Sequence, residues 1–177
     1  MAWWLASGGD EMTKGSLKEN TIAAVLIAMT VALSILVVIP IPATKGIVTL
    51  CEVGIYTSAI LYGRRMGLLV GGASGFLIDI LTGYPVWCLF SLVIHGTQGL
   101  VVGWLLPRHH KGIRSMLLPL LVGSLVMVIG YCLATTLLFG WPAGLASIFG
   151  NVVQVGFGAG VTLSIVGPLT RLKPDLV

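Results

Sequence analysis

The chain has 177 residues, of which 56% are hydrophobic and 9% are charged, and its mean hydropathy is +1.03. Soluble domains carry about 25% charged residues, so this composition excludes a soluble globular protein and indicates an integral membrane protein. The net charge of +4 does not indicate nucleic-acid binding, because the basic residues lie between apolar runs, as topology signals do.

The first twenty residues, MAWWLASGGDEMTKGSLKEN, are expected to form a cytoplasmic N-terminal segment. Their apolar part is far too short for a signal peptide. Met12 is a candidate natural start, with residues 1–11 a cloning remnant or an alternative start. We therefore expect a short segment over 1–20 and a membrane domain over 21–177.

Six apolar segments approach or exceed the roughly 20 residues that a membrane-spanning helix needs. Proline and glycine punctuate their ends, as at IPIP, GRR and GWP. The sequence thus predicts an all-α bundle of six transmembrane helices. The segments cover about 21–39, 46–62, 66–82, 86–106, 115–139 and 143–169.

The basic residues predict the orientation of this bundle. If the N-terminus is cytoplasmic, nine of the ten lysines and arginines lie inside and only Lys45 lies outside. This bias predicts that both termini are cytoplasmic. The outer loops are then 40–46, 82–87 and 139–143, with Tyr84, Trp87 and Trp141 at the outer interface. The nine inner residues are Lys14, Lys18, Arg64, Arg65, Arg108, Lys111, Arg114, Arg171 and Lys173.

Small residues recur at four-residue spacing in several segments, which places them on one face of each helix. Such stripes let helices approach closely in lipid, either inside the bundle or against another membrane protein. The stripes are Ala24, Ala28 and Ala32; Gly67, Gly71 and Gly75; Gly99 and Gly103; and Gly156 and Gly160.

Polar side chains inside a bilayer are costly, about 2.5–3.5 kcal/mol for a charge at mid-helix, so their depth is informative. Counted at 1.5 Å per residue, five helices place such groups in the outer half of the membrane. This asymmetry predicts a polar pocket that is open to the outside and sealed below, rather than a channel. The residues are Glu52, Asp79, His95, Gln98, Tyr131, Asn151 and Gln154.

Each of these residues also has a simpler structural interpretation. Glu52 and Asp79 can cap helix ends or pair with Lys45, and the amide and imidazole groups can bond neighbouring helices. Tyr84 and Trp87, in the stretch DILTGYPVW, can be interface anchors. As a binding site, aromatics, amides, an imidazole and carboxylates together suit a small flat ring that carries hydroxyl groups.

An enzymatic alternative rests on the motif GASG, with Ser74 in the third segment and His95 in the fourth. Serine with histidine as base is an acyl-transfer pair, and six spans with these residues resemble rhomboid intramembrane proteases. Two points count against this alternative. Rhomboid proteases place the serine in the fourth span and the histidine in the sixth, and a glycine-rich motif carries little information in a chain with 24 glycines.

Other chemistry has little support in the sequence. The three cysteines, Cys51, Cys88 and Cys132, have neither the number nor the spacing of a disulfide framework or a zinc site. The paired His109 and His110 lie in a basic loop without a third ligand nearby. No phosphate-binding loop is present, so we expect neither a metal site, nor a catalytic residue, nor ATP hydrolysis in this chain.

The run from Ile39 to Leu106 resembles the substrate-binding (S) subunit of energy-coupling factor (ECF) transporters. The matching features are IPIP at the end of the first segment, Glu52 early in the second, LYGRRMGLLVGGASGFLIDILTGYPVW, and HGTQGLVVG. The chain is most similar to the riboflavin-type branch, which includes pyridoxine and hydroxymethylpyrimidine subunits. The similarity extends from about Thr21 over nearly the whole remaining chain.

This resemblance implies a transport subunit in a prokaryotic plasma membrane that binds a vitamin from outside. Its partners would be a membrane coupling (T) subunit and two cytoplasmic ATPases, which hold the ATP and magnesium. In that family an Ala-x-x-x-Ala face on the first span contacts the coupling subunit, and Ala24, Ala28 and Ala32 match it. The family is thought to transport by toppling in the membrane. Its site, built from spans four to six, corresponds here to Trp87, His95, Gln98, Tyr131, Asn151 and Gln154.

The resemblance also narrows the ligand. Metal-transporting subunits carry an N-terminal histidine motif, which is absent after Met1 and after Met12. The outer loops contain no cluster of basic residues that could bind a polyanionic ligand. A pyridine or pyrimidine alcohol, pyridoxine or hydroxymethylpyrimidine, fits best, and riboflavin and pantothenate remain alternatives. In this interpretation DILTGYPVW closes over the pocket, with the turn set by Gly83 and Pro85. Tyr84 and Trp87 would supply stacking surface, and with the seven polar residues above they make nine side chains predicted to bind substrate.

Overall fold

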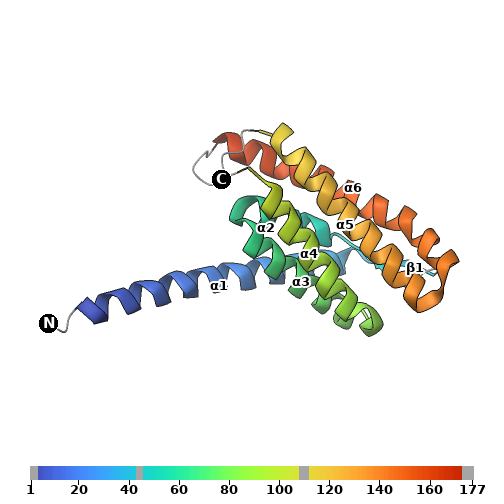
Figure 1. Ribbon diagram of the computed structural model, residues 1–177, viewed down its shortest axis with the longest axis horizontal. Helices are drawn as coiled ribbons and strands as arrows, with labels where there is room; N and C mark the ends of the chain where they lie inside the picture. Colours follow the sequence, from blue (N-terminus) through green and yellow to red (C-terminus); the bar gives the residue numbers. More distant parts are fainter. Residues whose placement is uncertain (1–3, 43–45, 108–111, 173–177) are drawn as a thin grey trace.

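The computed structural model describes residues 4–42, 46–107 and 112–172, and it is all-α apart from one small hairpin (Figure 1). The all-α part of the predicted fold class is therefore confirmed. The helices are α1 (Trp4–Leu36), α2 (Cys51–Tyr62), α3 (Arg64–Leu81), α4 (Cys88–Leu105), α5 (Arg114–Phe139) and α6 (Trp141–Leu172). A 3₁₀ turn, η1 (Pro85–Trp87), precedes α4, and the strands are β1 (Ile39–Ile41) and β2 (Gly46–Val48).

Four of the described helices contain a segment long and apolar enough to cross a membrane. These segments are Leu17–Leu36, Pro85–Leu105, Arg114–Phe139 and Trp141–Val166. The 12 residues of α2 rise only about 18 Å, less than the roughly 30 Å of a hydrocarbon core. Helix α3 begins with two arginines, Arg64 and Arg65. The protein is thus a multi-pass membrane protein, and the assignment of α2 and α3 as full spans stays a prediction.

A β-hairpin replaces the predicted junction between the first two apolar segments. Strands β1 and β2 pair antiparallel, with Ile39 opposite Val48 and Ile41 opposite Gly46. We expected the first segment to run to 39 and the second to begin at 46, and both boundaries were wrong. Pro40 and Pro42 have no N–H to donate and so end the helix, and the flanking β-branched residues suit a strand.

Helices α3 and α4 pack with their backbones nearly in contact. A Cβ added at Gly67 would overlap the backbone of Gly99, one at Gly99 would overlap Gly67, and one at Gly71 would overlap the carbonyl of His95. Gly156 and Gly160 on α6 meet nothing within 4 Å. The stripes on α3 and α4 therefore serve packing inside the bundle, whereas the stripe on α6 faces outward.

This difference predicts opposite responses to a single added methyl group. Gly99→Ala should destabilise the protein by about 1–3 kcal/mol, because two rigid backbones must separate. Gly160→Ala has free space and should be neutral or slightly stabilising, since alanine favours a helix by up to about 1 kcal/mol over glycine. Thermal unfolding of both variants in detergent checks the contrast, and equal melting temperatures would contradict the packing described here.

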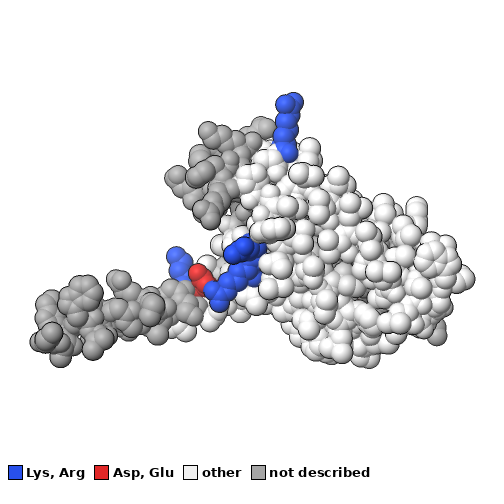
Figure 2. Space-filling view, viewed as in Figure 1, with Lys and Arg blue, Asp and Glu red and all other residues white. Residues whose placement is uncertain are grey.

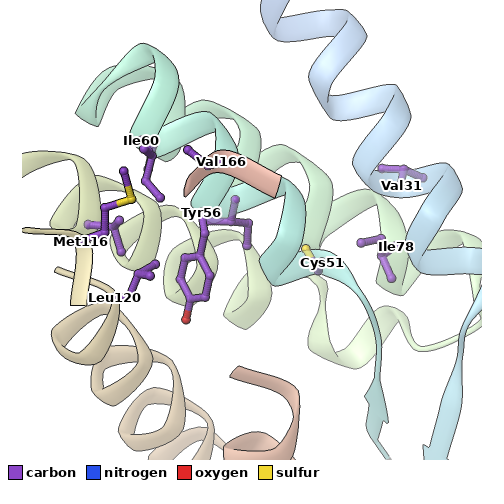
Figure 3. Close-up of a cluster of buried hydrophobic side chains, with 11 residues drawn as sticks. Val31, Cys51, Tyr56, Ile60, Ile78, Met116, Leu120 and Val166 are labelled. Carbon is purple, nitrogen blue, oxygen red and sulfur yellow. The ribbon is translucent and has the colours of Figure 1, made fainter. Parts of the chain in front are cut away.

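The main apolar core surrounds α2, on which Ile55, Tyr56 and Ala59 are fully buried. Figure 3 shows Val31 of α1 and Ile78 of α3 on one side of this helix, and Met116 and Leu120 of α5 on the other. Figure 3 shows the phenol of Tyr56 pointing away from α2, and its hydroxyl bonds Gln98 and Ser124.

The lysine and arginine side chains that the structure describes gather at one end of the molecule. Figure 2 shows lysines and arginines beside α1 and at the start of α5, while no described lysine or arginine is seen at the opposite end of this face. Among the described side chains these include Lys18, Arg64, Arg65 and Arg114. Arg65 lies 3.7 Å from Glu19, a solvent-exposed ion pair between α1 and α3. The hairpin and the α5–α6 turn lie toward the opposite end (Figure 1).

Candidate ligand-binding site

A cavity lies between the hairpin and helices α2 to α6. It brings together six of the nine side chains predicted to bind substrate: Asp79, Trp87, His95, Tyr131, Asn151 and Gln154. Its volume is about 40 Å³, far below the roughly 300–1,000 Å³ of typical ligand pockets. Entry of a ring-sized ligand would therefore require some of the wall to move outward.

The loop after α3 contributes one residue, Trp87, to the wall of the cavity. Gly83 has a positive φ of 86° and Pro85 opens the η1 turn. Trp87 is only 3% exposed, and its ring centroid lies 6.0 Å from that of Tyr131. Tyr84 packs in the same apolar cluster without lining the cavity, so its predicted stacking role has no support from this arrangement.

The hairpin forms another side of the cavity, which the sequence did not predict. Ile41, Gly46, Ile47 and Val48 all line it. Just after β2, the backbone N–H of Thr49 donates to Oε1 of Gln154 on α6 at 2.9 Å. This bond ties the base of the hairpin to the last helix.

A chain of side-chain hydrogen bonds runs from the cavity wall into the bundle. Tyr131 Oη bonds Ser91 Oγ at 2.5 Å and His95 Nε2 at 3.0 Å. His95 Nδ1 bonds Gln98 Oε1 at 2.9 Å. The chain continues from Gln98 Nε2 to Tyr56 Oη at 2.9 Å, and from Tyr56 Oη to Ser124 Oγ at 2.8 Å.

The two acidic residues occupy different positions relative to the cavity. Asp79 lines it, is 5% exposed, and has no hydrogen-bond partner at Oδ2. Glu52 is fully buried outside the lining, neither of its oxygens is hydrogen-bonded, and Oε1 lies 3.6 Å from His95 Nδ1. Glu52 therefore does not cap α2, and the alternative partner Lys45 lies outside the described residues. Buried polar atoms without partners are rare, so Asp79 Oδ2 marks a place for a donor.

Gln98 is the third predicted residue outside the cavity, together with Glu52 and Tyr84. Gln98 is fully buried behind His95, and its side chain is hydrogen-bonded to His95 and Tyr56. Sequence reasoning did not find Tyr56, Ser91 or Ser124, because tyrosine and serine are common in membrane helices and carry no distinctive spacing. Thr49, Cys51, Thr135 and Ser147 also line the cavity and were not predicted as site residues.

The alanine face of α1 is open. Ala24, Ala28 and Ala32 are all exposed, on a helix that inclines away from the bundle toward its N-terminus (Figure 1). Other residues of α1 are buried against the bundle, namely Ala23, Thr30, Val31 and Ser34.

Comparison with known proteins identifies the family. The model of the ECF-type riboflavin transporter S component matches residues 14–171. The chain belongs to this family. It is 37% identical over 159 residues to the thiamine precursor transporter HmpT of Lactococcus lactis subsp. cremoris (strain MG1363), with 89% of this chain and 90% of that protein covered. It is also 37% identical over 143 residues to an uncharacterized protein of Pyrococcus woesei, with 77% and 95% covered.

The resemblance drawn from the sequence is thus confirmed, and an S component is a transporter subunit rather than an enzyme. The rhomboid alternative is not supported. Ser74 is fully buried and its Oγ has no hydrogen-bond partner, while both ring nitrogens of His95 are bonded to Gln98 and Tyr131. The serine and the histidine therefore do not form a dyad.

The described residues contain no group of three histidine, cysteine or acidic side chains that could hold a metal ion. Cys51, Cys88 and Cys132 are free thiols. His109 and His110 lie outside the described residues.

Proposed function

We propose that this S component captures a small heteroaromatic vitamin precursor, with hydroxymethylpyrimidine favoured, and delivers it to an ECF coupling module. The observation that carries this proposal is the buried Asp79 carboxylate, which has an unpartnered oxygen at the wall of a cavity lined by Trp87 and Tyr131. Such a wall suits a flat ring that bears an N–H or O–H donor.

The ligand follows from size and hydrogen bonding. Hydroxymethylpyrimidine carries an amino group on its ring that can donate to Asp79, and a hydroxymethyl group that can bond an amide such as Asn151. Its ring is smaller than the tricyclic flavin, which suits a cavity of about 40 Å³ better. The relative HmpT is named a thiamine precursor transporter, and hydroxymethylpyrimidine is the pyrimidine half of thiamine. Pyridoxine is the second candidate because it shares the ring size and the hydroxymethyl groups.

Delivery would use the exposed alanine face of α1. Ala24, Ala28 and Ala32 would dock on a membrane coupling subunit that is joined to two cytoplasmic ATPases, and the ATP and magnesium would reside on those ATPases. In this proposal both termini face the cytoplasm, and the subunit topples in the membrane to carry its pocket inward. The basic end seen in Figure 2 supports that orientation, because positive residues favour the cytoplasmic side.

A tryptophan-fluorescence titration of the purified, ligand-stripped protein tests the ligand. We expect hydroxymethylpyrimidine to quench emission saturably at nanomolar to low micromolar concentration, because Trp87 lines the cavity and is buried. Trp87→Phe should lose the quenching while its affinity falls less than about tenfold, since phenylalanine keeps a stacking ring. Trp141→Phe is the matched control, because Trp141 is 60% exposed and should leave the signal intact.

Pyridoxine, thiamine, riboflavin and pantothenate belong in the same titration. Saturation by one of these alone would replace hydroxymethylpyrimidine as the ligand. No response to any of the five, by fluorescence and by native mass spectrometry, would contradict a site for these vitamins.

A further inference from the structure

The hydrogen-bond chain through His95 can run in either of two directions. Hydroxyl groups both donate and accept, a neutral imidazole donates from one nitrogen and accepts at the other, and an amide can turn over. In one direction the imidazole proton of His95 is on Nδ1, and each group donates its hydrogen bond to the next group along the chain from Ser91 to Ser124. In the other it sits on Nε2 and each group donates toward Ser91. Both directions satisfy all five bonds, so a group outside the chain must select between them.

Glu52 is that group. Its Oε1 lies 3.6 Å from His95 Nδ1, on the same nitrogen that bonds Gln98 Oε1 at 2.9 Å. A carboxylate only accepts, so it attracts an N–H at Nδ1 and repels a lone pair there. Both oxygens of Glu52 are buried, and the His95 imidazole lies within ion-pair distance of Oε1. Glu52 therefore places the proton on Nδ1.

The consequence reaches the cavity through two further bonds. With Nε2 unprotonated, the Tyr131 hydroxyl donates to it, and the oxygen of Tyr131 accepts from Ser91 at 2.5 Å. Ser91 then has no proton left for the cavity, which it lines beside Asp79. Asp79 offers its unpartnered Oδ2 as a second acceptor at the same wall.

We propose that Glu52 is a positioning residue for ligand specificity: from outside the cavity it sets the direction of the chain through His95 and Tyr131, so that Ser91 and Asp79 both accept. This wall then selects a ligand that presents an N–H donor, such as a ring amine. It discriminates against a ligand that presents a carbonyl at the same place. The ligand class rests on the proposed function, whereas the direction of the chain does not.

The first experiment uses the full-length protein without ligand. Nitrogen NMR of protein labelled in its histidines distinguishes the two neutral tautomers of imidazole, and His95→Gln assigns the signal. We expect the Nδ1–H tautomer in the wild type at neutral pH. An Nε2–H tautomer or a doubly protonated ring would overturn the inference, and this result does not depend on any variant folding or on any ligand binding.

The second experiment uses Glu52→Gln, which removes the charge and keeps the shape. We expect the Nε2–H tautomer to appear, because the two directions become close in free energy. Ser91 can then donate toward Asp79, so the affinity ratio between hydroxymethylpyrimidine and its analogue with a ring carbonyl in place of the amine should fall by roughly tenfold, the range for one hydrogen bond. Glu19→Gln makes the same chemical change at an exposed position, 64% accessible, and should alter neither readout.

The outcomes separate the two claims. An unchanged tautomer or an unchanged affinity ratio in Glu52→Gln would overturn the role of Glu52. Absence of binding by both compounds in wild-type protein that shows the Nδ1–H tautomer would overturn the proposed ligand class and leave the direction of the chain established.

Discussion

Asp79→Asn should weaken binding of hydroxymethylpyrimidine by about 10- to 100-fold while the protein stays folded. The substitution keeps the shape of the side chain but replaces a charged acceptor that has one free oxygen. Hydrogen bonds to charged groups contribute about 1.5–3 kcal/mol, which corresponds to this loss in affinity. Calorimetric titration of the purified protein measures it directly.

The fold should tolerate this change because the affected oxygen makes no internal hydrogen bond. The structural role of Asp79 lies in its backbone carbonyl, which accepts from the N–H of Tyr84 at 2.7 Å and is unaffected by the substitution. Ser74→Ala is the matched control: it also removes a buried, unpartnered oxygen from α3, but at a position that does not line the cavity. Equal affinities in wild type and Asp79→Asn would remove Asp79 from the binding site.

The sequence predicted the helical class and most of the cavity for a physical reason. Polar side chains are rare enough in apolar helices that their depth alone indicates where they meet. His95, Tyr131, Asn151 and Gln154 come from three helices and do line one cavity. Depth does not give the rotation of a helix, however, and this is why Glu52 and Gln98 lie behind the cavity wall rather than in it.

The hairpin shows a second limit of reading apolar runs. The apolar runs predicted only an outer loop over 40–46, and the pairing of β1 with β2 is a contact that hydropathy does not reveal. The two prolines indicated an end to the helix but not the structure beyond it. Helix depth therefore could not predict that strand residues such as Ile47 line the cavity.

The hydrogen-bond chain shows a third limit. Tyr56 and Ser124 are 68 positions apart, and only the packing of α2 against α5 brings their hydroxyls to 2.8 Å. Nothing in either local sequence indicates this pairing. By contrast, the glycine stripes on α3 and α4 were informative, because a close backbone approach leaves room for no other residue.

Ala28→Trp should abolish vitamin uptake in cells while leaving ligand affinity unchanged. Ala24, Ala28 and Ala32 form an exposed small-residue face, and such faces allow two helices to approach closely in lipid. An indole in the middle of that face would hold a docking helix away from α1 along its whole length. Because Ala28 is absent from the cavity lining, the binding step should not respond.

Two measurements on the same variant separate docking from binding. Co-purification with the coupling subunit and the ATPases should fall by more than about tenfold, as loss of a packed helix interface requires, while fluorescence titration should give the wild-type dissociation constant. Leu125→Trp is the control, since Leu125 is 50% exposed on α5 and adds the same bulk to an apolar surface away from α1. If Ala28→Trp assembles and transports normally, the coupling subunit docks on another face, and the outward glycines of α6 become the next surface to test. If both tryptophan variants lose assembly, bulk anywhere on the lipid-facing surface interferes, and the alanine face has no special role.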